Sequence, residues 1–142
     1  MDYVSTEQLI DRCGEAMLIA LTDRAEVATG QIDADAVARA VADAQAVIDG
    51  HLAGRYVLPL VEVPPLVTDL AGAIVIWKLH RKSPDEKIAE DHREARRTLA
   101  QIAAGTVRLP VAAAEPAVAG GTGARVTDRT RPFTAETLKG FI

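Results

Sequence analysis

The sequence predicts an all-α fold: a small four-helix body over residues 1–105, followed by an extended, partly flexible C-terminal arm. Apolar residues recur at steps of three and four in four stretches, which is the period of a helix with one buried face. Hydrophobic residues make up 49% of the chain but aromatic residues only 4%, since alanine supplies much of the apolar content. Alanine has the highest helix propensity and little side chain to bury, so we expect thin, closely packed helices in one domain.

The first two helices have clear start signals. Ser5 and Gln8 fit a capping box, and apolar residues follow at helical spacing as far as Leu21. Gly14 interrupts this pattern, which leaves a bend or a split of the first helix open. After a loop over 22–32, Asp33 is the expected N-cap of the second helix, and Gly54 its expected C-terminal cap.

The third and fourth helices follow a proline-rich crossing. Pro59 forces the residue before it into an extended conformation, and Pro64 and Pro65 lead into a helix over about 66–82. That helix is apolar nearly all round, so we expect it at the centre of the body or at a subunit contact, with Trp77 in the core. The fourth helix is expected to start at 83–86, with a cap, a proline and two acidic residues, and to end at Gly105.

Composition divides the remaining chain into two segments. Residues 106–130 predict a short strand at 106–109 followed by a flexible linker that is rich in glycine and alanine. Residues 131–142 contain both phenylalanines of the protein and predict a C-terminal docking segment. Its candidate partner-binding residues are Arg131, Phe133, Leu138, Phe141 and Ile142. The alternative is that this segment folds back onto its own domain.

A second group of candidate residues joins the second helix to the third. Gly54, Arg55, Tyr56 and Pro59 predict a structural hinge. Arg55 and Tyr56 could contact a partner. The interpretation that we favour is structural: Tyr56 closes the core while Arg55 bonds the exposed carbonyls of a helix end.

Charge and motif content indicate a non-enzymatic protein. Up to Gly105 there are 11 basic and 17 acidic residues, and none of the four predicted helices carries a basic face, which argues against gripping nucleic acid. The single cysteine and three widely spaced histidines predict no metal site, and no phosphate loop or catalytic grouping suggests a cofactor. The longest apolar run, residues 71–77, is too short to span a membrane.

Three sequence motifs carry a resemblance to a known family. They are Ile48-Asp49-Gly50-x-Leu52-Ala53-Gly54-Arg55-Tyr56-x-Leu58-Pro59-Leu60, then Val63-Pro64-Pro65-Leu66 before an apolar helix, and finally Arg131-x-Phe133-Thr134-x-Glu136-Thr137-Leu138-x-x-Phe141. In this order and spacing the chain resembles the head–tail connector (adaptor) proteins of Mu-like prophages. The motifs span nearly the whole chain outside the linker.

The resemblance implies a virion component of the head–tail joint that is made in the host cytoplasm and is not an enzyme. Such adaptors form a ring, commonly of twelve subunits, beneath the portal protein, and their C-terminal arms often reach the portal. The implied partners are the portal, neighbouring copies in the ring and a tail-side stopper or tail-completion protein. DNA would pass through without specific binding. The alternative function is that of a small helical nucleic-acid-binding packaging or regulatory protein.

Overall fold

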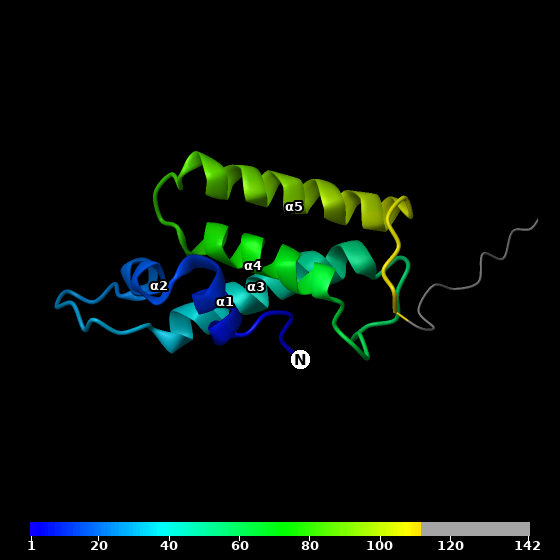
Figure 1. The fold of residues 1–142 in the computed structure, drawn as a ribbon. Helices are drawn as coiled ribbons and strands as arrows, with labels where there is room; N and C mark the ends of the chain where they lie inside the picture. The colour runs from blue at the N-terminus through cyan, green and yellow to red at the C-terminus, as the bar shows by residue number, and fades with distance from the viewer. Residues whose placement is uncertain (112–142) are drawn as a thin grey trace, which may run out of the picture.

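The computed structural model describes residues 1–111, which form five helices and no strand. They are α1 (Thr6–Cys13), α2 (Glu15–Thr22), α3 (Ala34–Leu52), α4 (Pro65–Leu79) and α5 (Glu86–Ala104). Figure 1 shows α3, α4 and α5 running lengthwise together, with the two short helices beside α3 and α4. Because α4 packs against both α3 and α5, and those two also touch, the long helices form a three-helix bundle.

The all-helical prediction is confirmed, but the predicted number of four helices is wrong. Gly14 separates α1 from α2 in a conformation with φ of +86°, which favours glycine. Its amide donates to the Ile10 carbonyl at the end of α1, and its own carbonyl accepts from Leu18 in α2. The predicted capping box is present, since Ser5 and Gln8 exchange backbone and side-chain hydrogen bonds. Gly14 therefore turns one predicted helix into two.

Three helix ends differ from the sequence prediction. Helix α4 ends at Leu79, whereas the sequence predicted an end at about residue 82. The C-cap of α3 is Ala53 in a right-handed helical conformation, and Gly54 is not among the glycines with positive φ. Helix α5 begins at Glu86 because Asp85, its N-cap, is extended, so Ser83 and Pro84 lie before the helix and not within its start.

The predicted strand at 106–109 is also wrong. The amides of Thr106 and Val107 both donate to the Gln101 carbonyl, at 2.9 and 3.2 Å. These bonds fold the chain back over the last turn of α5, so these two amides are not available to a neighbouring strand. Gly105, with φ of +81°, allows this reversal in the left-handed conformation typical of a residue that ends a helix.

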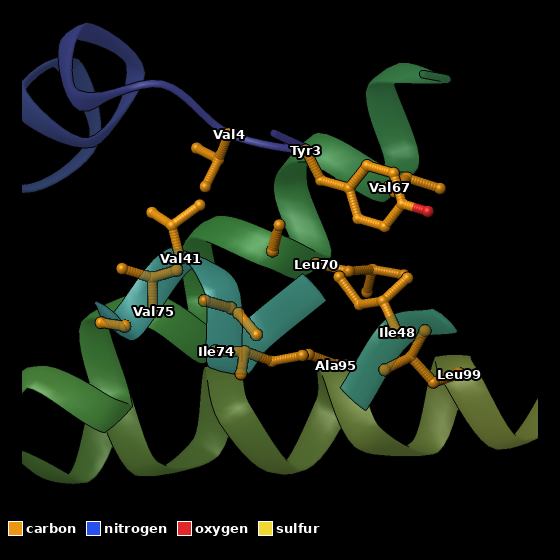
Figure 2. Close-up of a cluster of buried hydrophobic side chains, with 14 of the residues drawn as sticks. Tyr3, Val4, Val41, Ile48, Val67, Leu70, Ile74, Val75, Ala95 and Leu99 are labelled. Carbon is orange, nitrogen blue, oxygen red and sulfur yellow. The ribbon is translucent and has the colours of Figure 1, made fainter. Parts of the chain in front are cut away.

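Helix α4 lies at the centre of the core, as its composition predicts. Its residues from Leu70 to Ile76 are all buried. Figure 2 shows side chains of α3, α4 and α5 meeting in this core, with Tyr3 and Val4 of the N-terminal segment beside them. Because Gly72 has no side chain, Arg12 of α1 can pack close to α4 at this position. A Cβ on residue 72 would lie only 3.3 Å from Cδ of Arg12. Helix α1 can therefore lay its arginine closely across α4.

Candidate functional site

The predicted hinge lies at one end of the bundle, where α3 and α5 both finish. Arg55 donates from Nε to the Ala103 carbonyl at 2.8 Å and from one terminal nitrogen to the Ala104 carbonyl at 2.9 Å. Carbonyls in the last turn of a helix have no partner within the helix and carry its negative dipole end, so a guanidinium is well suited to bind them. Arg55 thus bonds the carbonyls of a helix end, and that end belongs to α5.

Tyr56 closes the same end from the inside. It is 6% exposed, and its hydroxyl accepts a hydrogen bond from the Leu109 amide at 2.9 Å. The bond fixes the chain after α5 against the turn after α3. We call this region, formed by Arg55, Tyr56 and residues 103–109, the exit end, because the chain leaves the last helix of the bundle there.

The other two hinge residues lie on the surface of the same connection. Gly54 is exposed in the turn after α3, and a Cβ built there would have no neighbour within 4 Å. Pro59 is exposed and follows a cis peptide bond. The structure therefore brings Arg55 and Tyr56 together with α5. The predicted docking residues Arg131, Phe133, Leu138, Phe141 and Ile142 lie outside the described residues.

Trp77 is not in the core, contrary to the sequence prediction. It is 38% exposed and stacks on the imidazole of His92 in α5, with ring centroids 4.1 Å apart and planes 7° apart. Its neighbours on α4, Ile76 and Leu79, fill the buried positions. Trp77 instead covers the seam between the end of α4 and the first half of α5.

Basic side chains surround this aromatic pair. Lys78, His80 and Lys82 line a recess of about 310 Å³ beside Trp77, in which Asp43 supplies the acidic group. Burial lowers the pKa of His92, and the positive charges of Arg96 and Lys78 lower it further. We call this surface the cationic patch; its members are Trp77, Lys78, His80, Lys82, His92 and Arg96. Sequence reasoning missed it because no single helix carries it.

An acidic surface lies in the groove between α4 and α5, at the side that α1 covers. Asp69, Asp91 and Glu94 line this groove of about 170 Å³. Arg12 of α1 pairs with Asp69, donates to the Asp69 carbonyl at 3.2 Å and approaches Asp91 at 3.9 Å. We call these three carboxylates the acidic flank. Two cations face these three carboxylates, since Lys87 pairs with Asp91 at 3.1 Å in addition to Arg12.

The described residues show no grouping for metal chemistry or membrane insertion. In residues 1–111, no three or more His, Cys, Asp or Glu side chains gather where they could hold a metal ion. No helix in this part of the chain has both the length and the apolar content needed to cross a bilayer.

Comparison with known proteins identifies the chain's relatives. The family described as "Bacteriophage Mu, Gp36" matches residues 3–128. "Gene product J" of Escherichia phage Mu is 36% identical over 143 residues, which cover 100% of both chains. "Mu-like prophage FluMu protein gp36" of Haemophilus influenzae is 29% identical over 140 residues, covering 99% of this chain and 98% of the relative.

A helical bundle with this sequence thus falls among the proteins of Mu-like phages and prophages. The chain belongs to the phage Mu Gp36 family.

Proposed function

We propose that the protein is a head–tail connector subunit. In this proposal, copies form a ring below the portal protein at the head–tail joint of the virion, after synthesis in the host cytoplasm. The ring joins head to tail and lines the channel through which DNA leaves. The observation that carries the proposal is the end-to-end similarity to Mu-like phage proteins, together with connector-like motifs that lie in order along the chain.

The exit end supports this function mechanically. Arg55 and Tyr56 fix the chain at 103–109 against the body, so the segment that follows starts from a defined point. Docking of an arm costs conformational entropy, which weakens binding. An arm that bridges two rings therefore benefits from an anchored start, because less freedom is then left to lose. The arm residues proposed to meet the portal are Arg131, Phe133, Leu138, Phe141 and Ile142.

The charge of the body supports a role beside DNA that does not involve gripping it. Residues 1–105 contain 17 acidic and 11 basic residues, so the bundle is negative overall. A negative channel wall repels phosphate and lets DNA slide without adhesion. The chemistry proposed for this protein is thus binding alone, with no enzymatic step and no cofactor, and the tail-side partner is a stopper or tail-completion protein.

Removing the arm tests the proposal. Deletion of 131–142 is expected to abolish co-sedimentation with the cognate portal, while circular dichroism of the helical body stays unchanged. A matched variant, Phe133→Ala with Leu138→Ala and Phe141→Ala, retains the chain length and is expected to lose most binding as well. A control with Val118→Ala, upstream of the arm, should bind normally. Undiminished portal binding by both arm variants contradicts the docking role.

One observation favours the alternative, a nucleic-acid-binding packaging or regulatory protein. The cationic patch combines an exposed tryptophan with Lys78, Lys82 and Arg96, a combination that also occurs on surfaces that stack bases and hold phosphates. Fluorescence anisotropy with labelled duplex and single-stranded DNA at low salt separates the two functions. The connector function predicts weak DNA binding without sequence preference. Tight DNA binding that is lost in the double variant Lys78→Glu, Arg96→Glu would support the alternative.

A further inference from the structure

The cationic patch has the composition of a protein interface. Tryptophan and arginine are enriched where interfaces bind most tightly, because they bury much area and still offer polar contacts. Trp77 keeps 38% of its surface exposed although it lies in the last turn of the most buried helix of the bundle. Its stacking on His92 holds the indole in one orientation, which reduces the conformational entropy that binding would remove.

The cationic patch and the acidic flank lie on opposite sides of the α4–α5 pair. In α4, Asp69 and Lys78 are nine residues apart, which places them about 180° apart around the helix axis. In α5, Glu94 and Arg96 are two residues apart, or about 160° around the axis. The groove of the acidic flank and the recess beside Trp77 accordingly share no lining residue.

The acidic flank is shaped to receive such a patch. The groove between its carboxylates also exposes Leu66, which is 36% exposed, above a floor formed by the buried residues Leu70, Ala73 and Ala95. An indole could cover this apolar surface while lysine and arginine reach the carboxylates at the sides. Glu94 is exposed, and Asp69 is 65% exposed despite its pairing with Arg12, so both remain open to a second cation.

We propose that the cationic patch of one copy docks on the acidic flank of the next copy. Opposite charges then meet at each contact, whereas a two-fold dimer through either surface would place like charges together. A contact between two different surfaces repeats from copy to copy and closes into a ring when its rotation allows. The inference rests on the proposed connector function, and it names the surfaces by which neighbouring subunits join.

Cross-linking of the full-length chain tests the pairing of the two surfaces. In a Cys13→Ala background, Ser83→Cys, between Lys82 and Pro84 of the recess, and Thr98→Cys, in the lining of the groove, place one thiol on each surface without removing a charge. With a short bismaleimide at high protein concentration and low salt, the doubly substituted chain is expected to form a ladder of oligomers. Each singly substituted chain should stay monomeric, because equivalent residues do not meet. Dimers of a single variant, or no ladder from the double variant, overturn the proposal.

Charge exchange adds a test that separates pairing from unfolding. Arg96→Glu is expected to weaken self-association at least tenfold, and Arg96→Glu with Glu94→Arg in the same chain should restore part of it, since one charge pair across the contact is then re-formed with its signs exchanged. The fluorescence of Trp77, the only tryptophan, reports association directly by a shift of its emission to shorter wavelength. If the exchanged double variant associates no better than Arg96→Glu alone, the pairing is wrong.

Two further assays distinguish this inference from the proposed function. Portal co-sedimentation without any cross-linked ladder overturns the inference and leaves the connector function standing. A ladder without portal binding supports the inference and counts against the connector function. A third outcome involves duplex DNA. If DNA binds the wild-type chain and prevents the ladder, and if the double variant Lys78→Glu, Arg96→Glu no longer binds DNA, then the patch binds nucleic acid. That result would overturn the inference.

Discussion

The guanidinium of Arg55 holds α5 from a position just beyond α3, across a separation of 48 residues. Hydrogen bonds with a charged donor contribute about 1.5–3 kcal/mol, less where solvent screens them. We therefore expect Arg55→Ala to lower the free energy of unfolding by about 1–3 kcal/mol in urea denaturation. Arg55→Lys should recover only part of this loss, because an ammonium cannot reproduce the planar fork of donors.

Arg39→Ala is the matched control for Arg55. Arg39 is exposed on α3, so its removal should change stability by no more than about 0.5 kcal/mol. If Arg55→Ala and Arg39→Ala unfold at the same urea concentration, Arg55 does not stabilise the exit end.

Two glycines should respond to alanine substitution with opposite signs. Gly105 has φ of +81°, and a Cβ there would overlap the guanidinium of Arg55, so Gly105→Ala is expected to destabilise the fold by about 1–2 kcal/mol or more. Gly50 lies within α3 with open space around it, so Gly50→Ala should stabilise by about 0.5 kcal/mol. Thermal unfolding of the two variants tests this, and equal shifts would refute the role of the left-handed turn.

The Trp77–His92 stack makes the protein sensitive to pH. Burial, then Arg96 and Lys78, lower the pKa of His92 below its ordinary 6.5. In the range between the two pKa values the unfolded chain binds more protons, so stability is full above about pH 6.5 and falls as pH drops through the folded pKa. Trp77 emission should titrate with a midpoint below 6.5, and His92→Phe should remove that transition. A midpoint at or above 6.5 contradicts the assigned environment.

At the scale of elements, the segment after α5 depends on one hydroxyl. Tyr56→Phe leaves the buried Leu109 amide without its partner, which costs about 1–3 kcal/mol. Hydrogen exchange at Leu109 should quicken by about tenfold or more. Tyr3→Phe is the control, because the Tyr3 hydroxyl donates to Asp49 of α3, whereas the Leu109 amide donates to the Tyr56 hydroxyl. Unchanged exchange in Tyr56→Phe would show that packing alone holds the segment.

The elements that the sequence predicted well are those with periodic apolar faces or side-chain caps. The Ser5 box, the Asp33 cap and the buried α4 follow from local patterns, and the structure confirms them. The split at Gly14 and the start of α5 at Glu86 depend on which of several permitted backbone conformations the tertiary fold selects. The strand at 106–109 failed for the same reason, since its amides found the end of α5.

The candidate site residues also differ in how much of their environment the sequence predicted. The position of Arg55 just after α3 predicted that it bonds helix-end carbonyls, but no local signal pointed to the end of α5, 48 residues away. Arg24 likewise follows the end of α2 and donates to the Leu79 carbonyl of α4 at 2.8 Å, a partner 55 residues away. Trp77 was assigned to the core because its helix is apolar, and only the packing of α5 shows that it lies at the seam. The residues of a surface that is assembled from several helices, such as the cationic patch, are separated in the sequence, so no local sequence pattern predicts the surface.

At the scale of the whole molecule, membership of the phage Mu Gp36 family confirms the resemblance to Mu-like prophage proteins. The connector role, the partners and the arm residues 131–142 remain proposals. The body's negative charge, its fixed exit end and its two oppositely charged flanks are the physical features that these proposals use. Together the proposals, and not the structure alone, describe a subunit that joins its neighbours side to side and reaches a larger assembly through its arm.

Electron microscopy of the full-length protein mixed with the purified cognate portal tests the connector function most directly. The proposal predicts a ring of helical bodies stacked below the portal, with one C-terminal arm per subunit in contact with it. Portal particles that carry no added density at saturating protein, in a buffer where the protein is folded by circular dichroism, would contradict it.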